Sequence, residues 1–164
     1  MRYSKIFDAT TAITLEDGAN LELVNSEFIG CDTAVKSNGQ ANITEFRGNT
    51  FNGGIGVDIT DSQNTNLDAG SFDQSNSFIG CIEGIKLSDR SSALIRFNEF
   101  INCGIGVLSS GSSPTVKFNT MDQCNIGCHI IGGSAEIELN DIGYTVTGII
   151  LNSCLLYTSP SPRD

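Results

Sequence analysis

The chain of 164 residues contains no tryptophan, one histidine and three prolines, and aromatic residues make up only 7% of it. Basic residues are scarce as well: 9 Lys and Arg stand against 19 Asp and Glu, a formal net charge of −10. Nucleic acid and anionic membrane surfaces repel such a chain, which excludes both as expected partners. The shortage of aromatic rings argues against a broad platform on which sugar rings would stack.

Two further patterns are missing. No apolar run is long enough to cross a membrane, so we expect no membrane insertion, and no signal peptide is visible at the N-terminus. Helical spacing of apolar residues is not sustained over ten residues anywhere. The second absence excludes the all-helical repeat proteins.

What the chain does contain is a repeat. The stretch "NSFIGCIEGIKLSD" (76–89) returns as "NEFINCGIGVLSS" (98–110), which aligns Phe78 with Phe100 and Cys81 with Cys103. A fixed period in this range predicts a solenoid, in which each unit buries its apolar edge against its neighbours. The aromatic or aliphatic position of the repeat recurs with spacings of 21 to 23 residues and one of 27, at positions 6, 28, 51, 78, 100, 121 and 142.

The local pattern within each unit identifies the kind of solenoid. Short alternating stretches such as Ile85-Lys86-Leu87 are separated by Gly, Asn and Ser, which is typical of strands and tight corners. A leucine-rich repeat has a similar period, but its Asn stands two residues beyond the strand, whereas Asn98 follows Ile95-Arg96-Phe97 directly. The sequence therefore predicts an all-β right-handed parallel β-helix. It would have about seven coils of 21–23 residues, one longer coil and a length of roughly 30 Å.

The unit "N-x-F-x-x-C-x-x-G-I-x-L" resembles the parallel β-helix repeat of the pectin-lyase-like superfamily, and the resemblance covers residues 3–153. It implies the fold more strongly than an activity. The superfamily includes polysaccharide lyases, hydrolases and epimerases, phage tailspikes, adhesins and non-catalytic surface proteins.

Both ends of the chain carry expectations. The repeat is already in phase at Ser4 and Ile6, and no capping helix is visible, so we expect 1–153 to be one β-helix fragment. Its remaining coils and caps, and any signal peptide, would belong to a longer protein. The last eleven residues, "CLLYTSPSPRD" (154–164), break the repeat and resemble a translated sequencing adaptor, so we treat them as an artefactual tail.

Two columns of identical residues are expected to be structural. Four cysteines share one repeat position, where Ala9, Gly54 and Thr145 replace them in other units; these substitutes are small and do not bind metals. Asn residues recur at the bend between the second and third strands, where stacked amides can bond to one another and Asn tolerates a left-handed backbone. The Asn column comprises Asn49, Asn76, Asn98, Asn119 and Asn140.

The resemblance implies that a substrate site, where one exists, lies on the first sheet, formed by the strands that follow the repeat glycine. Lys36, Asp58 and Lys86 occupy its outward position in successive coils. As a catalytic site, Asp58 would bind a cation or act as acid or base, and the lysines would hold an acidic sugar. As a structural feature, the three would form an exposed charge ladder worth at most about 1 kcal/mol per pair. Only one carboxylate lies in this row, whereas glycosidases use two.

The longest coil suggests calcium as the one candidate cofactor. The segment 58–76 contains Asp58, Asp61, Asp68 and Asp73, and carboxylate oxygens on a loop are ligands that Ca²⁺ prefers. The alternative is a solvated polar loop without a ligand, because the spacing matches no known calcium motif. His129, the only histidine, has no Ser or Cys placed beside it by the repeat in a way that suggests a triad.

Two functions follow from these observations. The first is a non-catalytic β-helix segment of a secreted or cell-surface bacterial protein, extracellular in location, that contacts a polysaccharide or a cell-surface glycan. The second is a fragment of a polysaccharide lyase, an epimerase or another carbohydrate-active enzyme. In that case Asp58, Lys86 and the loop at 58–73 would carry the chemistry, or the missing coils would.

Overall fold

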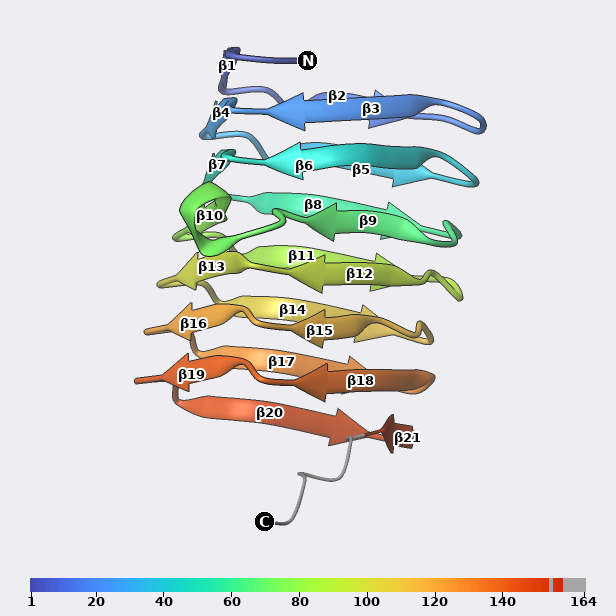
Figure 1. Ribbon diagram of the computed structural model, residues 1–164, viewed down its shortest axis with the longest axis vertical. Helices are drawn as coiled ribbons and strands as arrows, with labels where there is room; N and C mark the ends of the chain where they lie inside the picture. Colours follow the sequence, from blue (N-terminus) through green and yellow to red (C-terminus); the bar gives the residue numbers. More distant parts are fainter. Residues whose placement is uncertain (154, 158–164) are drawn as a thin grey trace.

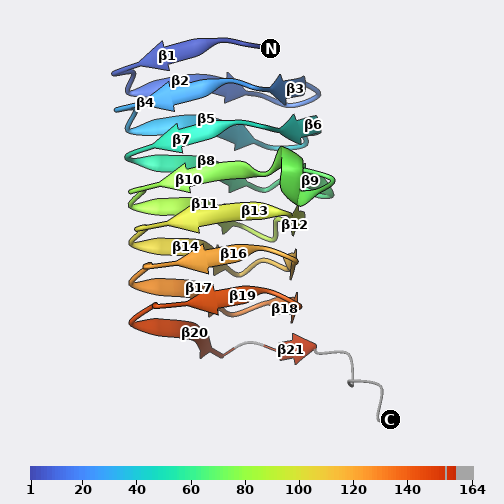
Figure 2. The ribbon, with the colours of Figure 1, turned by 60° about the vertical axis from the view of Figure 1, so that its left-hand side comes forward.

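The computed structural model describes residues 1–153 and 155–157. The chain winds into a rod of stacked coils, each built from three short parallel strands (Figure 1 and, turned by 60°, Figure 2). The N-terminus lies at one end of the rod and the last strand at the other. The predicted all-β parallel β-helix of about seven coils, one of them longer, is confirmed.

The first sheet runs the length of the rod. Its five middle strands share one burial pattern, in which the second and third residues both face inward and the fourth faces outward, as in Glu83–Ser88. The strands are β2 (Thr11–Leu15), β5 (Thr33–Asn38), β8 (Ile55–Thr60), β11 (Glu83–Ser88), β14 (Ile105–Ser110), β17 (Ile126–Ile131) and β20 (Thr147–Asn152).

The third sheet is also continuous over seven coils. It comprises β1 (Lys5–Phe7), β4 (Glu27–Ile29), β7 (Thr50–Asn52), β10 (Asn76–Ile79), β13 (Asn98–Ile101), β16 (Thr120–Asp122) and β19 (Asp141–Gly143).

The second sheet departs from the expected single stack, because its ladder is broken between the second and third coils. β3 (Asn20–Val24) and β6 (Asn42–Arg47) form one piece. The other comprises β9 (Thr65–Asp68), β12 (Ala93–Arg96), β15 (Thr115–Lys117), β18 (Ser134–Glu138) and β21 (Leu155–Tyr157).

The extra residues of the longest coil lie at one corner. They form a segment at 69–75 between β9 and β10, including the 3₁₀ turn η1 (Phe72–Gln74), which projects from the rod in Figure 1. Asp58 and Asp61 therefore occupy regular positions of the coil, and only Asp73 lies in the insertion.

Residues 155–157 pair in register with β18, although the sequence pattern assigns them to the tail beyond residue 153. Backbone ladder bonds do not depend on side-chain identity, so three extended residues can add to the free edge of β18 whatever their origin. The rest of the predicted tail, residues 154 and 158–164, lies outside the described residues.

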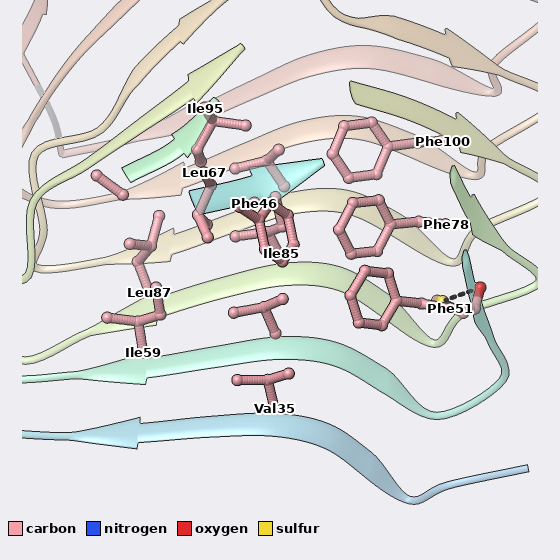
Figure 3. Close-up of a cluster of buried hydrophobic side chains, with 14 of the residues drawn as sticks. Val35, Phe46, Phe51, Ile59, Leu67, Phe78, Ile85, Leu87, Ile95 and Phe100 are labelled. Carbon is pink, nitrogen blue, oxygen red and sulfur yellow. Dashed lines mark hydrogen bonds between the residues drawn. The ribbon is translucent and has the colours of Figure 1, made fainter. Parts of the chain in front are cut away.

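Large apolar side chains stack inside the rod, one per coil. The rings of Phe28, Phe51, Phe78 and Phe100 are nearly parallel, with centroids 5.2, 4.7 and 4.8 Å apart from coil to coil. Figure 3 shows three of these rings beside aliphatic side chains of the other two sheets. Because the strand spacing of about 4.8 Å matches the stacking distance of aromatic rings, one Phe per coil fills the same slot repeatedly.

The cysteines form a second inner column. Cys81, Cys103 and Cys124 are 1–2% exposed, and each thiol lies within 3.4–3.7 Å of the carbonyl oxygen of the Phe in the preceding coil. Cys31 occupies the same position, and all five described cysteines are free thiols. The expectation that they stack as small buried residues is confirmed.

The Asn column is a buried hydrogen-bond ladder. The backbone N–H and the side-chain amide of Asn98 both donate to Oδ1 of Asn119, at 3.0 and 3.3 Å. The Asn98 amide also donates to the Leu67 carbonyl in the second sheet, at 2.9 Å, while its Oδ1 accepts from Asn76. Each Asn thus joins two coils and two sheets, so buried polar groups at this corner are satisfied.

One part of the Asn expectation is wrong. The left-handed residue at this corner is the one before the Asn, with φ of 53° at Phe97 and 56° at Phe118, and no Asn of the column has positive φ. The Asn side chain is selected here for its hydrogen bonds and not for its backbone tolerance, because it must accept from one coil and donate to others.

Serine forms a shorter ladder at the corner after the first sheet, which the sequence pattern did not reveal. The hydroxyl of Ser112 accepts from the Ser91 N–H at 3.1 Å and donates to the Ser110 carbonyl at 3.1 Å. By contrast, Ser37 and Ser109 point into the apolar core and their hydroxyls find no hydrogen-bond partner.

We predict that Asn98→Ala lowers the free energy of unfolding by about 2–3 kcal/mol. The change leaves one amide hydrogen of Asn76 buried without a partner and removes the bond that Asn98 donates to the Leu67 carbonyl, and each lost bond to a buried group carries a desolvation cost. Urea unfolding followed by circular dichroism measures the loss. Asn125→Ala, at an exposed corner, is the control and should change stability by less than about 0.5 kcal/mol. Equal losses in the two variants would contradict the ladder.

A second prediction compares two buried serines. Ser109→Ala should raise the free energy of unfolding by about 1 kcal/mol, because it removes a buried hydroxyl that has no partner between Leu87 and Ile130. Ser112→Ala should lower it by about 1 kcal/mol, because that hydroxyl bridges two coils. Thermal and urea unfolding of both variants test the opposite signs; a loss in Ser109→Ala would show that its hydroxyl is satisfied.

Candidate functional site

The outward row of the first sheet is arranged as predicted. Asp58 pairs in register with Lys36 of the preceding coil and Lys86 of the next. The row continues through Leu108 and His129 toward the C-terminal end. Charged side chains of alternating sign therefore occupy three successive coils, and apolar or neutral ones the rest.

Glu83 joins this charged row, which the sequence reasoning missed. Gly84 and Ile85 both face inward, so Glu83 and Lys86 share the outer face, with Glu83 Oε2 3.7 Å from Lys86 Nζ. The clue in the sequence is Gly84. This residue faces inward, where a Cβ would lie only 2.6 Å from the Phe100 ring, so a glycine is needed there and the in–out alternation of the strand is broken.

Two of the charged residues, Glu83 and Lys86, line a shallow hollow of about 500 Å³, together with residues that include Gly54 and Ile82. The hollow exists because the coil with Gly54 is one residue shorter than its neighbours at this corner. Oδ1 of Asp58 and Oε2 of Glu83 are covered by protein yet have no hydrogen-bond partner. Glu83 and Lys86 thus lie beside an exposed Ile82 (68% exposed), with Lys36 and Asp58 farther along the same outward row. Such a surface can bind hydroxyl and carboxylate groups of a ligand.

The four predicted calcium ligands are not brought together. Asp58 lies on the first sheet, Asp61 at the next corner beside Arg90 (3.8 Å), Asp68 at the end of β9 beside Arg96 (3.5 Å), and Asp73 on η1. Among the described residues, no group of three or more His, Cys, Asp or Glu side chains could hold a metal ion. The described residues therefore do not gather these four carboxylates at one point. Spacing in the sequence could not show that the coil carries these residues around three of its sides.

His129 lies in the outward row between Leu108 and Ile150, and its Nε2 is 3.2 Å from Oδ1 of Asn152. No nucleophile is placed beside it by the described contacts. It is a surface residue of the first sheet.

An aromatic cluster on the corner between the second and third sheets was also missed. The rings of Phe97 and Phe118 are stacked at 5.3 Å, and Phe72 of η1 meets Phe97 edge-on at 5.1 Å. The Arg96 guanidinium lies 5.2 Å from the centre of the Phe97 ring. Phe72 is 60% exposed. We call Phe72, Phe97 and Phe118 the corner aromatics; nothing in the repeat links Phe72 to the other two, because it belongs to the insertion.

Burial controls the chemistry of the thiols. It raises the pKa of Cys128 to about 12, helped by the nearby Cys124. The pKa of Cys124 is also raised, by its hydrogen bond with Cys103 and by burial. Thiols that stay protonated are neither nucleophiles nor good metal ligands, which applies to Cys124 and Cys128. The pKa of Cys81 is instead lowered, mainly by its hydrogen bond with Cys103.

Stacked parallel strands, inner side-chain ladders and left-handed corners define a parallel β-solenoid. Residues 1–142 match the family model described as right handed beta helix region, and the chain belongs to that family. The match confirms the predicted hand. No curated protein and no solved structure gives a significant match.

No helix within residues 1–153 and 155–157 is long and apolar enough to span a bilayer.

We predict that the cysteines at 31, 81, 103, 124 and 128 resist iodoacetamide at pH 8 in the native protein and react fully in urea. Because the pKa of Cys128 is raised on folding from 9.0 to about 12, its contribution to stability is complete below pH 9 and is lost as the pH rises toward 12. Peptide mass spectrometry locates the label, and urea titrations between pH 8 and 11 follow the stability. Rapid native labelling of Cys103 or Cys124 would contradict the buried column.

Proposed function

We propose that the chain is a non-catalytic β-helix segment of an extracellular or cell-surface protein, and that its first sheet contacts an acidic polysaccharide. One observation supports this most: Lys36, Asp58 and Lys86 lie in one outward row, and Lys86 and its neighbour Glu83 line a hollow. The two ammonium groups would pair with uronate or sulfate groups, and the carboxylates would accept hydrogen bonds from sugar hydroxyls.

The shape of this face favours binding over turnover. The hollow is shallow and open, whereas catalytic sites exclude water so that electrostatic interactions with the reacting atoms are strong. Lys86 Nζ lies 3.7 Å from Glu83 Oε2, an ion-pair arrangement that suits the binding of charged groups better than service as a general base. Binding along a rigid rod needs no such base.

A carbohydrate-active enzyme, a lyase or epimerase, is the second candidate, and the position of Glu83 favours it. Asp58 and Glu83 supply two carboxylates on neighbouring coils beside Lys86, where the sequence row offered one. A lyase would release unsaturated uronate products, which absorb in the ultraviolet, from a uronate polymer.

We predict that the protein binds uronate-rich polysaccharides such as polygalacturonate or alginate, and that Lys36→Ala/Lys86→Ala weakens binding about tenfold. Two lost charge contacts of about 0.7 kcal/mol each account for that factor. Glycan arrays and microcalorimetry measure it, with and without calcium.

The control is Arg90→Ala/Lys117→Ala, which changes the net charge equally but lies away from the outward row; it should leave affinity unchanged. No binding to any acidic polymer, with or without calcium, would remove the proposal. If the protein released an ultraviolet-absorbing product from these polymers and Lys86→Ala abolished that release, the enzyme would replace the binding proposal.

A further inference from the structure

A second concave surface lies on the corner between the second and third sheets, away from the hollow of the first sheet. It is a groove of about 430 Å³ whose lining includes Tyr3, Asn25, Glu27, Gly48 and Thr50. The groove exists because Asn25 and Gly48 are small at the position where later coils carry Phe97 and Phe118. A Cβ at position 48 would lie only 2.1 Å from Oδ1 of Asn25 and would fill the floor.

Two exposed aromatic rings lie at this corner. Tyr3, which lines the groove, is 78% exposed, and Phe72, on η1, is 60% exposed. The turn with Phe72 is held against the floor by a bond from the Gly48 N–H to the Gln74 carbonyl (2.8 Å) and by Arg47 donating to the Gln74 side chain (3.3 Å).

The groove offers hydrogen bonds without net charge. Lys5 and Glu27 at its side form an ion pair, so their charges cancel. Among the described residues, the exposed amide of Asn25 and the hydroxyl of Thr50 have no side-chain hydrogen bond, which leaves them able to donate to and accept from a ligand. Aromatic rings with neutral donors and acceptors between them match the apolar faces and the hydroxyl rims of sugar rings.

An extended peptide fits this groove less well. The backbone N–H groups of Tyr3, Asn25 and Gly48 already donate to neighbouring coils, at 3.1, 3.0 and 2.8 Å. An added strand would find no free backbone donors there, and main-chain bonds provide the affinity in that mode of recognition.

We propose that this corner groove binds a neutral oligosaccharide, with Tyr3 and Phe72 stacking on its rings. This inference rests on the proposed contact with glycans and adds a separate surface of different specificity.

The test is microcalorimetry of the 164-residue chain with cellotetraose, maltotetraose and chitotetraose. We expect at least one of them to bind, Tyr3→Ala and Phe72→Ala each to weaken binding at least fivefold, and Tyr3→Phe to retain it. Tyr144→Ala is the matched control, because Tyr144 is 92% exposed and has φ of 50° but lies at another corner. Thermal unfolding of each variant confirms that the fold is intact.

Binding of none of the three neutral tetrasaccharides, or unchanged affinity in both Tyr3→Ala and Phe72→Ala, would overturn the groove. Lys36→Ala/Lys86→Ala separates the two proposals, since it should weaken acidic polymers and leave the neutral tetrasaccharide unaffected. A loss of both ligands in that variant would overturn the groove as a separate site. Acidic binding without neutral binding would overturn the groove alone, and the converse would overturn the proposed function of the first sheet alone.

Discussion

Each coil of this protein buries its apolar edge only against the coils above and below it. A side chain inside the rod therefore has, as its nearest neighbour, the side chain about 22 positions away, held there by parallel ladder bonds. Stacked Phe rings 4.7–5.2 Å apart satisfy this constraint, because the preferred spacing of rings and the spacing of strands nearly coincide. The same constraint governs every other column.

At the corners the constraint acts on polar groups. A coil with three sides must turn sharply, and each turn exposes backbone donors and acceptors to a buried environment. Asn98 and Ser112 solve this locally, since each side chain bonds to the next coil as well as to its own. Because these polar side chains already bond to neighbouring coils inside the rod, the functional groups that a ligand can contact belong to outward residues such as Lys86 and Tyr3.

Large buried side chains made the fold predictable from the sequence. Phe78 and Phe100, Cys81 and Cys103, and the Asn column repeat at one period, and burial leaves few alternatives at those positions. The outer surface was less predictable, because outward residues obey no repeat. Glu83 reached the charged face only because Gly84 turns inward, and Phe72 met Phe97 only because the segment 69–75 folds back at one corner. The dispersal of the four aspartates has the same cause: sequence distance along a coil does not say which side of the rod a residue occupies.

The corner aromatics show how the regular stacking of coils affects the outer surface. Phe97 and Phe118 occupy left-handed positions where Gly48 and Asn25 sit in earlier coils, so strain of roughly 1 kcal/mol or more per residue is tolerated there. Ring stacking and the nearby Arg96 guanidinium offset part of that cost. Stacked rings turn their faces toward each other and present mainly edges to solvent. Tyr3, which lines the groove, and Phe72, on η1, are more exposed than the stacked rings of Phe97 and Phe118 at this corner. A low aromatic content is thus compatible with sugar stacking, since the relevant quantity is the number of free ring faces at one groove and not the composition of the chain.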